Sequence, residues 1–120
     1  MRLINLTIVG HSPGRAGSPE KSKTIQRVKR WLNQHELYEY DWYNLVDYHA
    51  PKLKLKEATL ESQIIEPYNK VIALGNLASQ WLTKNNINHL KVPHPSGLNR
   101  QWNNPETENI TINKIKQYLD

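Results

Sequence analysis

The chain has 120 residues and carries 16 Lys and Arg against 11 Asp and Glu, which gives a formal net charge of +5 near pH 7. This length supports one hydrophobic core rather than two, so residues 1–120 are expected to form a single domain. The absence of cysteine excludes disulfides and cysteine-ligated metal sites. No apolar run is long enough to span a membrane. The positive charge favours a polyanionic partner such as nucleic acid, although a moderately basic soluble protein would fit almost as well.

The first predicted elements are a strand and a helix. Residues 3–9 form a short β-rich run that stops at Gly10, as expected of a buried strand. Apolar residues then recur at helical spacing from Ile25 to Leu32, with basic residues on the remaining faces. This pattern predicts a helix that ends near His35.

The middle of the chain gives a weaker pattern. Residues 37–46 are rich in Tyr and Trp and form the second strand candidate. Lys and Leu alternate over residues 52–56, which indicates an edge strand or an extended loop. Residues 57–65 are expected to be helical.

The second half of the chain repeats the order of strand and helix. Residues 71–75 predict a third buried strand, after which Asn76 could cap a helix. Residues 89–92 predict a fourth strand, and Pro105 introduces a last helix. Strands that alternate with helices indicate an α/β protein with a parallel sheet covered on both faces. The carboxyl ends of its strands, where ligands bind in such sheets, should bring Gly10, Asn44, Gly75 and His94 together.

The stretch from Val92 to Arg100 combines several kinds of chemistry. Prolines on either side of His94 stiffen the backbone, and the imidazole can donate a hydrogen bond or a proton near neutral pH. Beyond it lie potential phosphate ligands, a permissive glycine and an apolar residue with no obvious core to join. Such a group could push a base out of a DNA stack. The alternative is a proline-stiffened loop with a surface histidine. The residues concerned are Ser96, Gly97, Leu98, Asn99 and Arg100.

Residues 94–100, His-Pro-Ser-Gly-Leu-Asn-Arg, resemble the second signature motif of the uracil-DNA glycosylase superfamily. The nearest form is that of the mismatch-specific branch for uracil and thymine, which has Asn-Pro-Ser-Gly-Leu-Ser-Arg there. The resemblance implies that His94 hydrogen-bonds O2 of the departing base and stabilises its anion or the oxocarbenium-like sugar. It also implies that Leu98 fills the hole left by the flipped base. The DNA-binding residues expected from this loop and from the basic rim are Ser96, Gly97, Leu98, Asn99, Arg100 and Arg15.

A second similarity lies in the loop Gly10-His11-Ser12-Pro13-Gly14, which resembles the superfamily's first motif. Gly10 and Gly14 would let backbone N–H groups face the base. In many members the residue before the proline is Asp or Asn and activates or positions the attacking water. Here it is Ser12, a poor general base, so His11 could take that part because imidazole is a competent base near pH 7. The alternative is an ordinary loop without a catalytic side chain.

Two further segments follow the superfamily's motif order. Asn44, followed by Leu-Val, resembles the Thr-Asn-Leu-Val segment whose Asn recognises the base. An amide suits that task, because its donor and acceptor match O4 and N3–H of uracil. A turn-forming Asn at a strand end is the alternative. Residues 71–78 match the superfamily's strand–Gly–helix unit, which has a structural role.

The resemblance covers residues 3–104 and implies a three-layer α/β/α sandwich around a four-stranded parallel sheet. The strand order 2-1-3-4 follows from the resemblance and from the right-handed crossover rule. The implied protein is a minimal member of the superfamily, of the kind that compact viral genomes encode. Its expected function is that of a DNA repair glycosylase, which flips uracil or a modified pyrimidine and cleaves the N-glycosidic bond by water attack at C1′.

Two alternatives stay open because Ser12 replaces the usual first-motif acid. One is a catalytically silent module that binds DNA or nucleotides, and the other is an enzyme that acts on modified pyrimidine nucleotides. The glycosylase reaction is expected to need no cofactor. No metal site is expected either, because the other histidines show no metal-ligand spacing. We expect a monomer with DNA as its partner and no membrane association, located in the cytoplasm, or in the host cytoplasm if the source is viral. The other histidines are His35, His49 and His89.

Overall fold

The computed structural model describes residues 5–12, 23–33, 40–50, 52–66, 69–95, 101 and 104–119. The strands in these ranges are β1 (Leu6–Gly10), β2 (Asp41–Asn44), β3 (Lys70–Leu74) and β4 (Leu90–Val92). The α-helices are α1 (Lys23–Asn33), α2 (Asn76–Lys84) and α3 (Pro105–Leu119). No helix in the described part of the chain is both long and apolar enough to cross a membrane.

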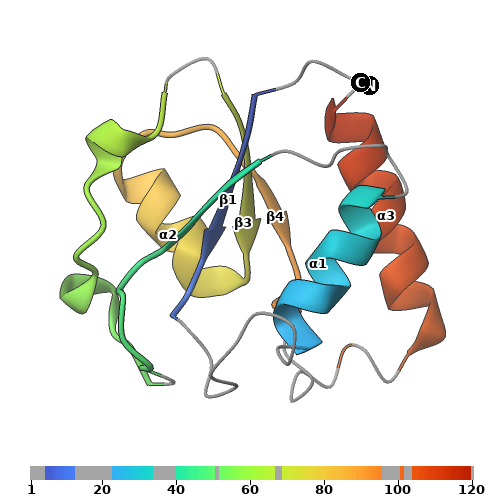
Figure 1. Ribbon diagram of the computed structural model, residues 1–120, viewed down its shortest axis with the longest axis horizontal. Helices are drawn as coiled ribbons and strands as arrows, with labels where there is room; N and C mark the ends of the chain where they lie inside the picture. The colour runs from blue at the N-terminus through green and yellow to red at the C-terminus, as the bar shows by residue number, and fades with distance from the viewer. Residues whose placement is uncertain are drawn as a thin grey trace.

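The strands form a four-stranded sheet in the order β2-β1-β3-β4, and every neighbouring pair is parallel. The expected fold class and strand order are therefore confirmed. In the pairing of β1 with β2, Gly10 lies opposite Asn44, so these two strands end level with each other. Figure 1 shows β1 and β3 at the centre of the sheet.

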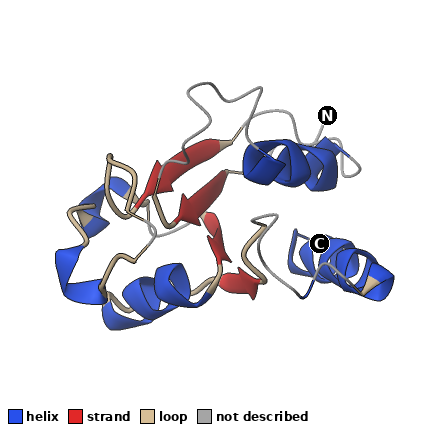
Figure 2. Ribbon diagram, turned by 90° about the horizontal axis from the view of Figure 1, so that it is seen from below, coloured by secondary structure: helices blue, strands red, loops and turns tan. Residues whose placement is uncertain are grey.

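Helices cover both faces of the sheet. Helices α1 and α3 lie on one face and α2 lies on the other, as Figures 1 and 2 show from two directions. Alternate residues of each strand therefore enter different cores. In β3, for example, Ile72 packs toward α1 and α3, whereas Ala73 packs toward α2. This arrangement is the three-layer α/β/α sandwich that the sequence predicts.

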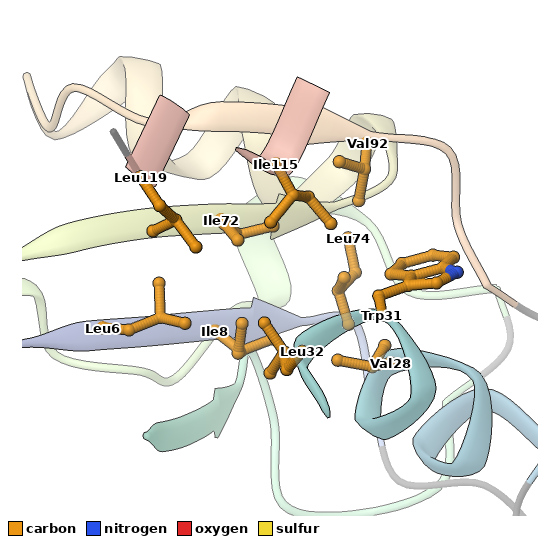
Figure 3. Packing of buried hydrophobic residues seen from close by; sticks show 10 residues of the cluster. All are labelled: Leu6, Ile8, Val28, Trp31, Leu32, Ile72, Leu74, Val92, Ile115 and Leu119. Carbon is orange, nitrogen blue, oxygen red and sulfur yellow. The ribbon is translucent and has the colours of Figure 1, made fainter. Parts of the chain in front are cut away.

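The core on the α1 and α3 side, called here the first core cluster, is the one drawn in Figure 3. Its helical contributions come from one apolar face of each helix, and Trp31 of α1 is its largest fully buried side chain. Burying such an aromatic side chain contributes about 2–3 kcal/mol through the hydrophobic effect. The cluster consists of Leu6, Ile8, Val28, Trp31, Leu32, Ile72, Leu74, Val92, Ile115 and Leu119.

Two expectations for the middle of the chain need correction. Strand β2 ends at Asn44, because the chain bends at Leu45 and its carbonyl accepts the N–H groups of Thr59 and Leu60 at 2.8 and 3.1 Å. These two hydrogen bonds tie the backbone at Thr59 and Leu60 to Leu45, and residues 57–65 do not form the expected α-helix. Only the short 3-10 turns η2 (Leu55–Glu57) and η3 (Ser62–Ile64) form there. Residues 52–54 form a loop that leads into η2. The loop alternative for residues 52–56 is therefore correct, and no strand forms there.

Helices α1 and α3 are joined at their solvent-facing edge through the Glu108 carboxylate. Oε1 of Glu108 accepts hydrogen bonds from Nε of Arg30 and Nε1 of Trp31, both at 3.2 Å, and forms a salt bridge with Arg30. The hydrogen bond from Arg30 is the main reason that the pKa of Glu108 lies below its usual value. The Arg30 side chain is 54% exposed, so solvent screens much of this attraction.

We therefore expect Glu108→Gln to lower the free energy of unfolding at pH 7 by about 0.5 kcal/mol. A carboxyl group with a lowered pKa in the folded state stabilises the protein above its unfolded pKa and loses that effect as the pH falls. The difference from wild type should thus narrow below pH 4.5, the ordinary value for Glu. Urea unfolding measured between pH 7 and pH 3 tests this, with Glu106→Gln as the control because it removes the same charge from the same turn. A difference that stays constant with pH would contradict the assignment.

Candidate active site

The carboxyl ends of β1 and β2 bring Gly10 and Asn44 into direct contact. A Cβ atom at Gly10 would lie 2.6 Å from Oδ1 of Asn44 and 3.1 Å from Nε1 of Trp42, so a larger residue there would displace the Asn44 amide from its present position. Nε1 of Trp42 donates a hydrogen bond to Oδ1 of Asn44 at 3.1 Å. The amide of Asn44 is therefore held by the strand that carries it and lies against the bare backbone of β1.

His11 links the β2 side of the site to the loop that follows β4. Its carbonyl oxygen accepts the Leu45 N–H at 3.1 Å, which anchors it to the end of β2. Its ring meets the ring of His94 edge to face, with centroids 6.2 Å apart and an interplanar angle of 89°. The predicted convergence of the strand ends is confirmed for these residues, because Gly10 and Asn44 make one contact and His11 and His94 make the next.

The position of His94 depends on Gly75, which lies between β3 and α2. Gly75 has φ of +93° and ψ of −177°, a conformation that is open almost only to glycine. A Cβ atom there would lie 3.1 Å from Cβ and 3.3 Å from Cδ2 of His94. The glycine thus permits the turn into α2 and leaves the surface on which the imidazole packs.

Two hydrogen bonds position the loops around these side chains. Oγ of Ser12 accepts the Ala50 N–H at 3.2 Å, so the hydroxyl ties the first loop to the segment after β2. A guanidinium nitrogen of Arg27, on α1, donates to the carbonyl oxygen of Pro95 at 3.3 Å, directly after His94. Sequence reasoning missed the contributions of Arg27 and Trp42. The spacing of two residues between Trp42 and Asn44, which puts both on one face of a strand, could have indicated the second.

Burial shifts both imidazoles toward the neutral form. It lowers the pKa of His11 below the ordinary value of 6.5. Burial also lowers the pKa of His94, and the nearby positive charge of a protonated His11 lowers it further. Two neutral imidazoles in contact can donate and accept hydrogen bonds near neutral pH without the cost of a buried charge.

One atom of the site lacks a hydrogen-bonding partner. Nε2 of His11 is buried and makes no hydrogen bond with the described residues. Buried polar atoms in native proteins are nearly always paired, so this nitrogen has a hydrogen-bonding capacity that the described residues leave unused. Asn44 also lines an open surface hollow of about 590 Å³, together with Thr59 and Leu60.

Several expected site residues lie outside the described residues. They are Gly14, Arg15, Ser96, Gly97, Leu98, Asn99 and Arg100. Within the described ranges, no group of three or more His, Cys, Asp or Glu side chains could hold a metal ion. Of the remaining histidines, His89 joins α2 to the start of β4, because its Nε2 lies 2.7 Å from Oγ of Ser79 and its Nδ1 lies 2.9 Å from the Ile87 carbonyl oxygen.

The fold and the site together define an α/β protein in which the carboxyl ends of parallel strands bring an amide and two imidazoles close to one another. The family model described as Uracil DNA glycosylase superfamily matches residues 3–116. The chain therefore belongs to the uracil-DNA glycosylase superfamily. Comparisons with curated proteins and with solved structures gave no match.

The lowered pKa values of the two histidines predict a specific pH dependence of stability. Because the unfolded chain binds protons near pH 6.5 and the folded site binds them only at lower pH, the free energy of unfolding should fall as the pH drops below 6.5. His94→Gln removes one of these two titrating groups, and so it should make the decline shallower. Urea unfolding at pH 8, 6.5 and 5 measures the effect, with the exposed His49→Gln as the control. Parallel curves for wild type and His94→Gln would contradict the prediction.

Gly75→Ala tests the support beneath His94. The strained backbone and the close Cβ should together destabilise the protein by about 1–3 kcal/mol and shift the imidazole. Asn76→Ala, at the next position, provides the control, because it removes only an exposed hydrogen bond from Lys91. Urea unfolding gives the stability, and the ring resonances of His94 in NMR spectra report its displacement. An unchanged stability together with unshifted ring signals would show that Gly75 does not support His94 in this way.

Proposed function

We propose that the protein is a DNA glycosylase that excises uracil, or a related pyrimidine, by hydrolysis of the N-glycosidic bond, as in base-excision repair. The contact between His11 and His94, beside the pair formed by Gly10 and Asn44, carries this proposal. It supports the proposal because an amide and two imidazoles near one another could bind a pyrimidine, stabilise its departure and hold a water molecule, and the chain belongs to this superfamily.

In this proposal Asn44 recognises the base. Its amide offers a donor and an acceptor side by side, which complement O4 and N3–H of uracil. The bond from Trp42 and the contact with Gly10 hold the amide in place before the base arrives. A site organised in advance loses little entropy on binding.

His94 stabilises the departing base. As the glycosidic bond breaks, negative charge develops on the pyrimidine, and an N–H aimed at O2 lowers the energy of that transition state. The lowered pKa supports this role, because a neutral imidazole remains a donor at physiological pH without needing a proton from solvent. The bond from Arg27 to the Pro95 carbonyl restrains the backbone next to the donor.

His11 takes the place of the acidic residue in the first loop. A neutral imidazole can accept a hydrogen bond from the water that attacks C1′, and Nε2 is a buried nitrogen in need of such a partner. Because C1′ acquires oxocarbenium character, the water needs only modest activation. Ser12 then has a positioning role, since its oxygen already accepts the Ala50 N–H.

DNA would approach the same edge of the sheet. The net charge of +5 favours a polyanion, and the loop after Pro95 supplies Arg100 for phosphates and Leu98 as the apolar wedge. Arg15 would add to the basic rim from the first loop. These side chains lie outside the described residues, so their roles rest on the sequence motif alone.

One observation favours a second candidate, a silent module that binds DNA or nucleotides. The first loop has no carboxylate at position 12, and the serine there is bonded to the backbone. In such a module the same amide and imidazoles would bind a base or nucleotide without cleaving it. An enzyme that acts on modified pyrimidine nucleotides would use the same groups on a smaller substrate.

The deciding experiment is a single-turnover cleavage assay on oligonucleotides that contain uracil or a modified pyrimidine, followed by alkaline cleavage of abasic sites. Removing one donor aimed at developing charge typically costs about 10²–10³ in rate. His94→Ala should therefore reduce cleavage by that order while DNA affinity stays nearly constant. His49→Ala, which removes an exposed imidazole, should cleave at the wild-type rate.

Each outcome separates the candidates. Wild-type cleavage that falls in His94→Ala supports the glycosylase. DNA binding that weakens steeply with salt, without cleavage of any pyrimidine tested, identifies the silent module. Cleavage of free modified nucleotides but not of oligonucleotides identifies the nucleotide enzyme. Equal rates for wild type and His94→Ala would remove His94 from the mechanism.

A further inference from the structure

We propose that Trp42 fixes the orientation of the Asn44 amide and thereby makes the site select pyrimidines with a carbonyl rather than an amino group at position 4. The inference rests on the proposed function, because it assigns a positioning residue to the same base site. The hydrogen bond between Nε1 of Trp42 and Oδ1 of Asn44 is the observation that carries it.

An asparagine alone does not distinguish uracil from cytosine. The oxygen and nitrogen of its amide have nearly the same size, and a half-turn about the last side-chain bond exchanges them. One orientation matches the O4 acceptor and N3–H donor of uracil, and the other matches the N4 amino donor and N3 acceptor of cytosine. Base selection therefore requires a second group that permits only one of the two orientations.

Trp42 has the chemistry for this task. An indole Nε1–H is only a donor, so it can pair with the amide oxygen but not with the amide nitrogen. The nitrogen lies 3.1 Å from Oδ1 of Asn44. A reversed amide would bring two donors together and leave both without an acceptor at this contact, which is the costly arrangement for partly buried polar groups. In the orientation of the Asn44 amide that this bond favours, Nδ2 can donate to a carbonyl at position 4 of the base.

The indole is itself held in place. Trp42 and Asn44 lie two residues apart on β2 and therefore on the same face of the sheet. The ring of Trp42 is partly buried and packs against the first core cluster. A Cβ at Gly10 would lie 3.1 Å from Nε1 of Trp42 and 2.6 Å from Oδ1 of Asn44, so the backbone of β1 forms a floor beneath both groups. The amide is thus confined by a rigid donor on one side and by backbone below.

The test compares Trp42→Phe with Trp31→Phe. The first substitution keeps an aromatic ring but removes the donor to Asn44. The second removes the indole donor of Trp31, which belongs to the first core cluster and is hydrogen-bonded to Glu108, and so it makes the same chemical change away from the base site. Figure 3 shows Trp31 on α1, among the core side chains.

The measurement is the affinity of each protein for free uracil and free cytosine, from NMR titration of isotopically labelled protein. It requires no cleavage. Wild type and Trp31→Phe should prefer uracil, and Trp42→Phe should lose about fivefold to tenfold of that preference, the ratio that one neutral hydrogen bond supports. In wild type, the indole N–H of Trp42 should also exchange slowly with solvent and lose that protection in Asn44→Ala.

The possible outcomes decide the inference independently of catalysis. An unchanged preference in Trp42→Phe, no preference in wild type, or no binding of either base would overturn it. A rapidly exchanging Trp42 indole proton in wild type would overturn it as well, even if Trp42→Phe did not fold. Selective binding that depends on Trp42 would sustain it even if no oligonucleotide were cleaved, in which case only the proposed hydrolysis would fail.

Discussion

The parallel pairing of β1 with a strand on each side is the constraint on which the rest of the structure depends. All five residues of β1 are buried, and the strand pairs with β2 along one edge and with β3 along the other. These pairings satisfy backbone groups that could not otherwise be buried. They also align the strand ends, so that Gly10 lies opposite Asn44 and the following residue, His11, is carried toward the loop after β4. The site is thus a direct consequence of the register of the sheet.

The central strands and the helices could be predicted because their sequence patterns agree with their final environments. The apolar run 71–74 is buried on both faces, as a central parallel strand must be, and the periodic apolar residues of α1 enter one core. The segment 57–65 could not be predicted in this way. Its helical propensity is outweighed by contacts far away in the sequence, namely the bonds of Thr59 and Leu60 to the Leu45 carbonyl and the packing of Leu60 on the α2 side of the sheet.

The candidate site could be predicted as a set of residues but not as a geometry. Motifs and strand ends singled out Asn44, His11 and His94, and the structure brings these strand ends together. The hydrogen bond of Ser12 depends on Ala50, a partner brought near by folding, so no local pattern specifies it. The two-residue spacing of Trp42 and Asn44 gives the face that they share but not the hydrogen bond between them. Sequence spacing gives the face on which a strand residue lies, whereas the partner of its polar atoms is decided by tertiary packing.

The same face of the sheet supplies both stability and chemistry. On β1, every second residue faces the same side of the sheet, so Leu6 and Ile8 enter the first core cluster and Gly10 lies beneath the site. On β2, Trp42 and Asn44 share that side in the same way. The chemistry is costly by itself, because two desolvated imidazoles lie in contact and Nε2 of His11 is buried without a partner among the described residues. The packed cluster offsets that cost. It also packs against the indole of Trp42, so under the proposed function the donors and acceptors of the site would be organised before a base arrives.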